Sequence, residues 1–157
     1  MLELMNTIAR CLLLVPLVAA AADDGFLVAL KEKHAGYRWS GKNYLSVDLN
    51  RDGASDRVAL GLQRTKVALA IEIMRGKEPI FVEIPIDASR QFGLCPGNEP
   101  SLSKRLQSEE TLESLGETPS GYELCPTCFE LEVSGGQCDP IYFYWDTKAN
   151  KLAWWRL

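Results

Sequence analysis

The alternation of apolar and polar positions predicts a chain built mainly from β-strands. Apolar residues recur at every second position in several stretches, and turn residues separate these stretches. The alternating stretches are residues 44–48, 58–62, 67–73, 80–86, 122–125, 128–133, 141–145 and 152–155. Short turns between them favour antiparallel pairing. We therefore predict a mainly β (α+β) fold with an antiparallel sheet of about 6–8 strands.

One short helix is expected at the N-terminal end of this β region. Asp23 or Asp24 can cap a helix whose apolar side carries Phe26, Leu27 and Leu30. The strand patterns begin soon afterwards and continue to the C-terminus. The sequence therefore predicts one globular domain over residues 23–157.

Residues 87–121 interrupt the strand pattern. This segment is rich in Ser, Glu, Pro and Gly, and it contains Cys95. Its composition is typical of loops, so we expect a long acidic loop or excursion held to the domain at Cys95.

Residues 1–22 have the pattern of a signal peptide. Arg10 supplies a positive charge, Cys11 to Val18 form an apolar core, and Ala19 to Ala22 give a small-residue cleavage region. This apolar stretch is shorter than the roughly 20 residues that a helix needs to cross a bilayer. We expect export to the periplasm or secretion, with no membrane span after cleavage.

The cysteine count supports export. The chain has 5 Cys, and the predicted cleavage removes Cys11. The remaining four, Cys95, Cys125, Cys128 and Cys138, are expected to form two disulfides, as is usual in exported domains. Three pairings are open, and the sequence does not choose among them.

Two other uses of these cysteines remain as alternatives. The spacing of Cys125 and Cys128 is that of a redox motif, although residues 129–133 continue as a strand pattern and not as a helix. All four cysteines could also bind zinc, but a second closely spaced pair is missing.

The charge balance argues against nucleic acid as a partner. The chain has 21 Asp and Glu against 17 Lys and Arg, for a formal net charge of −4. Nucleic-acid binders usually present a basic face. The fractions of apolar and charged residues, 46% and 24%, are ordinary for a globular domain.

One loop carries the chemistry of a cation site. Oxygen-bearing side chains occupy relative positions 1, 3, 5 and 9 of residues 48–56, with Gly53 at position 6. Side chains at alternate positions of a tight loop converge, and hard oxygen ligands suit Ca²⁺. The predicted metal ligands, including one main-chain carbonyl at position 7, are Asp48, Asn50, Asp52, Ala54 and Asp56.

The loop differs from an EF-hand. Position 12 is Ala59 where an EF-hand has Glu, and a strand pattern follows where an EF-hand has a helix. Residues 44–60 instead resemble the strand–calcium-loop–strand unit of FG-GAP and VCBS-type repeats, here in a single copy. This resemblance implies calcium binding in an extracellular adhesion or recognition domain. The aromatic segments 142–146 and 154–156 resemble the C-terminal hairpin of small exported bacterial proteins with such a loop.

The alternative for this loop is a plain turn without an ion, because Asp, Asn and Gly favour turns in any case. Arg51 and Arg57 offset two of the three carboxylates, so we expect weak calcium binding, with a Kd of about 10⁻⁴–10⁻³ M. An ion here would be structural and not catalytic.

The sequence offers little support for an enzyme. His34 is the only histidine, and no nucleophile motif lies near it. A carboxylate pair of the glycosidase type could come from four glutamates, which alternate with apolar residues and are therefore expected on solvated strand faces. These are Glu72, Glu83, Glu130 and Glu132.

The aromatic C-terminal hairpin is a candidate interface. Tyr142, Tyr144, Trp154 and Trp155 are expected on the side opposite Phe143 and Trp145, where they are either exposed or buried beneath another element, such as the N-terminal helix. Exposed, they would suit a protein or carbohydrate partner.

The sequence therefore favours an exported, noncatalytic calcium-binding or interaction module. Two alternatives are a periplasmic or secreted enzyme inhibitor that uses residues 87–121 as its inhibitory loop, and a small carboxylate-dependent hydrolase.

Overall fold

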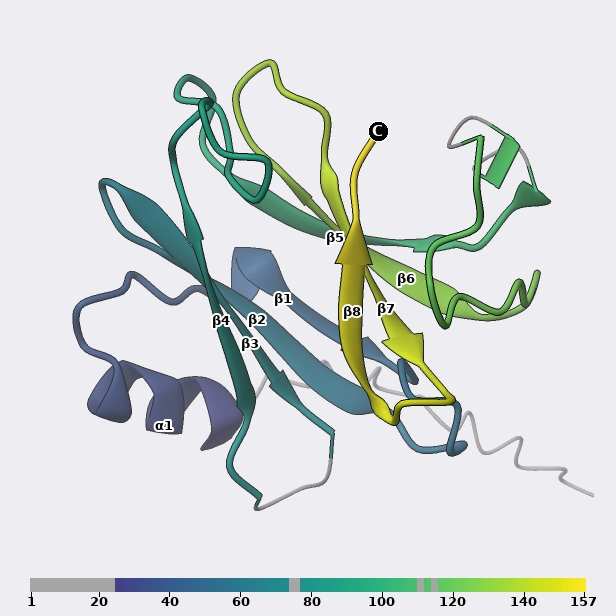
Figure 1. The fold of residues 1–157 in the computed structure, drawn as a ribbon. Coiled ribbons are helices and arrows are strands. Elements are labelled where there is room, and N and C mark those ends of the chain that lie inside the picture. The colour runs from purple at the N-terminus through teal and green to yellow at the C-terminus, as the bar shows by residue number, and fades with distance from the viewer. Residues whose placement is uncertain (1–24, 74–76, 110–111, 114–115) are drawn as a thin grey trace, which may run out of the picture.

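Eight strands form two four-stranded antiparallel sheets in the computed structural model, which describes residues 25–73, 77–109, 112–113 and 116–157. The strand order is β1-β2-β3-β4 in one sheet and β5-β6-β7-β8 in the other (Figure 1). The first sheet comprises β1 (Tyr44–Val47), β2 (Asp56–Leu62), β3 (Lys66–Glu72) and β4 (Ile80–Pro85). The second comprises β5 (Ser101–Leu106), β6 (Phe129–Ser134), β7 (Ile141–Asp146) and β8 (Lys151–Trp155). The predicted mainly β fold is confirmed.

The main core lies between the two sheets. Alternate residues of β2 and β3, such as Val58, Leu60 and Leu69, meet Leu131 and Phe143 of the second sheet in one buried cluster. In β2 and β3 the larger apolar side chains lie on this face, which accounts for the period of two in these stretches of the sequence. The sheets are thus held together by apolar burial.

The outer face of the first sheet is covered by helix α1 (Gly25–Lys33), as Figure 1 shows. Phe26, Leu27 and Leu30 of the helix are buried, as the sequence predicts. The sheet residues beneath the helix are small: Ala59, Ala68 and Ala70 belong to this buried cluster. Large residues face the main core and small residues face the helix, so both sides of β2 and β3 are apolar.

Glycine at position 61 has a specific packing reason. A Cβ atom added there would lie 2.8 Å from ring carbons of Trp39, closer than real Cβ contacts allow. Trp39 is buried and its Nε1 donates a hydrogen bond to the carbonyl of His34 (3.1 Å). Because Gly61 has no side chain, the indole of Trp39 can pack directly against the first sheet beside the helix.

The outer face of the second sheet is covered by Leu112, Tyr122 and Leu124, which come from the segment between β5 and β6. Tyr122 from this segment packs with three aromatic side chains of β7 and β8, and Leu112 and Leu124 lie against the same cluster. The rings of Tyr142 and Trp155 stack with centroids 4.1 Å apart. This segment, and not the N-terminal helix, buries the aromatic hairpin.

The prediction of residues 87–121 as one long loop is wrong. Residues 101–106 form β5, which pairs with β6 along its full length, and Leu94 is completely buried in the main core. Only Leu102 of β5 is buried, so the strand lacks an apolar alternation that sequence reading could detect. Its main-chain pairing with β6 determines its conformation. Conversely, residues 122–125 are not a strand.

The predicted leader, residues 1–22, lies outside the described residues, and so does Cys11. Within the described segments, no helix is long and apolar enough to cross a membrane.

Two disulfides join the remaining cysteines. Cys95 pairs with Cys138 across 43 residues, and Cys125 pairs with Cys128 across 3 residues. The prediction of two disulfides is confirmed. Of the three possible pairings, the structure has Cys95–Cys138 with Cys125–Cys128. Cysteines joined in this way are not zinc ligands, so the four-cysteine zinc alternative is excluded.

The two disulfides should differ in their effect on stability. A longer closed loop loses more entropy in the unfolded chain, so the chain-entropy model gives about 4 kcal/mol for Cys95–Cys138 and about 2 kcal/mol for Cys125–Cys128. We expect the Cys95→Ser/Cys138→Ser variant to lose about twice the free energy of unfolding that Cys125→Ser/Cys128→Ser loses. Urea denaturation of both variants measures this, and equal or reversed losses would contradict the pairing.

Candidate calcium-binding loop

The candidate loop connects β1 to β2, the first two strands of the first sheet. Val47 pairs with Asp56 at the end of this hairpin, so residues 48–55 form the connection. Val47 and Leu49 are buried in the main core, whereas residues 52–55 are exposed. The loop is therefore anchored at its base and open to solvent at its tip.

Two residues of the loop have a left-handed backbone. Gly53 has φ 83°, a conformation that glycine adopts without strain and that a side chain disfavours. Arg51 has φ 63°, which is uncommon for a residue with a Cβ atom. Glycine at position 53 is thus required by the turn, and Arg51 needs other contacts to hold it.

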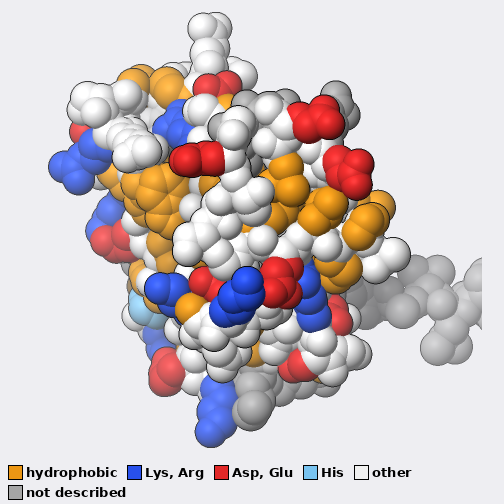
Figure 2. Space-filling model, turned by 45° about the vertical axis from the view of Figure 1, so that its right-hand side comes forward, with side chains coloured by type: hydrophobic (Ala, Val, Ile, Leu, Met, Phe, Trp, Pro, Cys, Tyr) orange, Lys and Arg blue, Asp and Glu red, His pale blue; other side chains and the backbone are white. Residues whose placement is uncertain are grey.

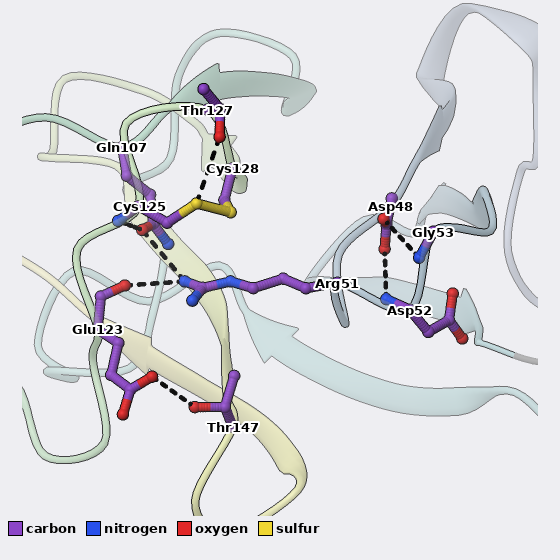
Figure 3. The surroundings of a disulfide bond; sticks show 10 residues. All are labelled: Asp48, Arg51, Asp52, Gly53, Gln107, Glu123, Cys125, Thr127, Cys128 and Thr147. Carbon is purple, nitrogen blue, oxygen red and sulfur yellow. Dashed lines mark hydrogen bonds between the residues drawn. A yellow bond between two sulfur atoms is a disulfide. The ribbon is translucent and has the colours of Figure 1, made fainter.

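Arg51 makes those contacts with the segment that covers the second sheet. Its Nη2 donates to the main-chain oxygen of Glu123 (2.8 Å) and to Oε1 of Gln107 (3.3 Å), as Figure 3 shows. The side chain therefore reaches away from the carboxylates of its own loop. Arg57 likewise turns to Glu72, with which it forms an ion pair. The two arginines offset the loop's negative charge less than the sequence suggests.

The oxygen side chains of the loop tip hold its backbone. Asp48 accepts hydrogen bonds from the main-chain N–H groups of Asp52 (3.2 Å) and Gly53 (3.0 Å). Asp52 accepts from the N–H of Ala54 (2.8 Å) and from Nδ2 of Asn50 (2.8 Å). The bonds from Asn50 and Ala54 lower the pKa of the Asp52 carboxyl. The turn is thus stabilised by hydrogen bonds from its backbone to its own acidic side chains.

Asp56 is the acid at the base of the loop, and it is buried. Its side chain is 1% exposed. Oδ2 accepts from the N–H groups of Leu49 (2.8 Å) and Asn50 (3.4 Å), whereas Oδ1 is buried without a hydrogen-bond partner. Burial raises the pKa of Asp56, the two N–H bonds oppose that rise, and the charges of Asp52 and Asp48 add to it.

Hydrogen bonds within one turn join four of the five predicted ligand residues, mostly from main-chain N–H groups to the carboxylates. Ala54, the fifth, is exposed on the same turn and would contribute only its carbonyl. Over the described ranges, no group of three or more His, Cys, Asp or Glu side chains is arranged to hold a metal ion. The donor chemistry nevertheless fits calcium, because the unpartnered Oδ1 of Asp56 is a buried anionic oxygen that a hard cation would satisfy.

The predicted aromatic interface is mostly buried. Tyr142, Tyr144 and Trp155 are buried, and Leu112, Tyr122 and Leu124 pack against them. Trp154 lies on the opposite face of β8, where its ring is 4.7 Å from that of Phe92 and its surface is 38% exposed. The expectation that all four share one face is therefore wrong, because side chains alternate along a strand and Trp154 follows the side of Phe143 and Trp145.

Trp154 lines an apolar groove of about 510 Å³ where the edge strands β4 and β8 approach each other. Ile80 and Val82 contribute from β4 and Leu152 from β8. On the face of the molecule that Figure 2 shows, hydrophobic side chains lie in separate areas among charged ones.

The prediction of solvated glutamates is wrong for two of the four. Glu130 is 0% exposed and pairs with Arg105 (2.6 Å, Oε1 to Nε), and Glu72 is buried against Arg57. Both lie on outer sheet faces, but covering elements close those faces, so alternation with apolar residues did not mean exposure. Glu83 keeps an exposed position, bonded to Lys66.

Comparison with protein-family models, with curated proteins and with solved structures finds no match to this chain. The candidate functions therefore rest on the residues themselves.

The buried Glu130–Arg105 pair yields a prediction about stability. Burial raises the pKa of Glu130, while Arg105 lowers it. Replacing Arg105 by Met leaves a buried carboxylate without its cation, so we expect a loss of about 3 kcal/mol at pH 7. The folded-state pKa of Glu130 then lies further above the unfolded value, and the folded protein takes up a proton as pH falls. Urea denaturation of the Arg105→Met variant between pH 8 and pH 5 should show that its free energy of unfolding rises again as the pH falls.

The double variant Arg105→Met/Glu130→Gln is the matched control, since it has no carboxylate to titrate. Recovery at low pH in both variants to the same extent would contradict this assignment.

Proposed function

We propose that residues 48–56 bind one calcium ion and that the protein is an exported, noncatalytic calcium-binding and interaction module. The observation that carries this proposal is the buried Oδ1 of Asp56, which has no hydrogen-bond partner at the base of a loop rich in oxygen ligands. A buried polar atom without a partner costs about 1–3 kcal/mol, and more when it is charged. A bound cation would remove that cost.

The local charge supports a cation as the ligand. Asp48, Asp52 and Asp56 place three acids in one turn, and the charges of the first two raise the pKa of the third. Arg51 and Arg57 engage other groups. Calcium would offset the mutual repulsion of these acids in a way that the neighbouring arginines do not.

The residues that would hold the ion are Asp48, Asn50, Asp52 and Asp56, with the carbonyl of Ala54. The ion would supply positive charge and additional contacts to a turn in which the backbone of Arg51 already has a left-handed conformation. Because Arg51 also contacts Glu123 and Gln107, a more rigid loop would hold the covering segment of the second sheet more firmly. The function of the ion would then be structural.

The interaction part of the proposal concerns Trp154. Its ring is partly exposed and lines the groove between β4 and β8, so a protein or carbohydrate partner would find an aromatic surface there. Export is proposed from residues 1–22, and two disulfides agree with an oxidising compartment.

The two alternative functions receive less support. Residues 87–121 contribute β5 and the core residue Leu94, so they are not a free inhibitory loop. Glu130 is closed to solvent, whereas a hydrolase needs a carboxylate that substrate can reach.

Calcium titration by calorimetry tests the proposal. We expect a single site with a Kd of about 10⁻⁴–10⁻³ M, and 10 mM Ca²⁺ should then raise the free energy of unfolding by about 1.4–2.7 kcal/mol. Asp48→Asn and Asp56→Asn should each weaken binding at least about tenfold, because each removes a charged oxygen ligand.

Asp87→Asn serves as the matched control. Like Asp48, Asp87 is a half-buried acid that accepts a hydrogen bond from a main-chain N–H, that of Ser89 (3.0 Å), but it lies outside the loop. Calcium affinity should be unchanged in this variant. Absence of binding up to several millimolar Ca²⁺, or equal loss in the control, would overturn the proposal.

A further inference from the structure

The Cys125–Cys128 disulfide differs from Cys95–Cys138 in the length of the loop that it closes. All four cysteines are half-buried, and the two residues between Cys125 and Cys128, Pro126 and Thr127, are exposed. The bond closes a loop of only 3 residues of separation, whereas Cys95–Cys138 spans 43 and lies beside the buried core residue Leu94. Opening the short loop therefore releases little of the chain.

The backbone around the short disulfide is held independently of the sulfur–sulfur bond. The N–H of Cys128 donates to the carbonyl of Cys125 (2.8 Å), and the N–H of Gln107 donates to the carbonyl of Cys128 (3.1 Å). Oε1 of Gln107 accepts from the N–H of Cys125 (2.9 Å). These three hydrogen bonds can persist when the sulfurs separate, so the loop is arranged to reform the bond.

Polar groups beside Cys125 suit a thiolate. The hydroxyl Oγ1 of Thr127 lies 3.6 Å from Sγ of Cys125, within range for an O–H to donate to sulfur. Nη2 of Arg51 lies 3.3 Å from the Gln107 oxygen that holds the Cys125 backbone, which places a positive charge nearby (Figure 3). A hydrogen-bond donor and a cation both favour the ionised sulfur.

We propose that Cys125 and Cys128 form a thiol–disulfide exchange site that accepts electrons from a dithiol. This activity is independent of the proposed calcium function. The Thr127 hydroxyl makes Cys125 the better leaving group, because a thiol that is more readily ionised leaves faster. The incoming thiolate therefore attacks Sγ of Cys128.

The exchange proceeds in two displacements. In the first, a thiolate of the dithiol bonds to Sγ of Cys128, the bond between the two cysteines breaks, and Cys125 leaves as the thiolate. In the second, the other sulfur of the dithiol attacks the sulfur joined to Cys128, which closes the dithiol's own disulfide and releases Cys128. Two electrons pass to the cysteine pair, and the two protons of the dithiol end on Cys125 and Cys128.

A redox titration of the whole chain with reduced and oxidised dithiothreitol tests the site. Acid quenching, alkylation and peptide mass spectrometry report each pair separately, and near-UV circular dichroism reports the fold. We expect Cys125–Cys128 to open at a ratio of reduced to oxidised dithiothreitol at least about tenfold lower than Cys95–Cys138 requires, with the near-UV spectrum retained. Opening of both pairs together, or only with loss of that spectrum, would show a purely structural bond and overturn the proposal.

The rate of opening tests the assignment of the leaving group. Thr127→Val removes the hydroxyl and should slow reduction by dithiothreitol by about three- to tenfold, whereas Thr127→Ser should restore the rate. Thr65→Val, at an exposed turn in the first sheet, should react as the unchanged protein does. If Thr127→Val and Thr127→Ser react equally fast, the direction of attack proposed here is wrong.

Discussion

At the start of β2, the carboxylate of Asp56 lies where solvent does not reach, and two N–H groups of the preceding turn donate to one of its oxygens. This interaction fixes where β1 ends and β2 begins, because Asp56 pairs with Val47 at the last position of the hairpin. Leu49, whose N–H makes the shorter bond, is buried in the main core. The loop, the first hairpin and the core are therefore joined through one buried acid whose second oxygen has no partner in the described residues.

Arg51 connects this loop to the other half of the molecule. Its side chain reaches Glu123 and Gln107, and Gln107 in turn holds the backbone of Cys125. The candidate cation loop and the short disulfide thus share one hydrogen-bonded chain, although they belong to different sheets. A change in the position of Arg51 would alter hydrogen bonds at both places.

The period of two in apolar residues predicted the strands that bury large side chains on one face and carry small or polar residues on the other. Val58, Leu60 and Leu69 alternate with small residues, and the structure places them in the core as expected. Strand β5 was not predicted, because only Leu102 of its six residues is buried and its sequence shows no apolar alternation. Its pairing with β6 uses main-chain groups that every sequence possesses, so no local pattern could reveal it.

The burial of the candidate site could not be predicted from the sequence. The spacing of oxygen side chains from Asp48 to Asp56 predicts a cation loop, and these residues as calcium ligands remain a prediction. That Asp56 is closed to solvent depends on how the two sheets pack, and that Arg51 turns away depends on the distant residues 107 and 123. The burial of Glu130 could not be predicted from the sequence either, because the segment that covers the outer face of its sheet, and not its own strand, determines how exposed it is.

Amide chemical shifts during a calcium titration show whether residues 48–56 bind the ion. The N–H groups of Leu49 and Asn50 bond to Asp56, and those of Asp52 and Gly53 bond to Asp48, so a cation held by these acids must alter all four. We expect saturable shifts at these four amides, with smaller shifts at Gln107 and Cys125 through Arg51. Absence of saturable shifts in the loop, or equal shifts at an unrelated acidic turn such as Asp87–Ser89, would contradict calcium binding by this loop.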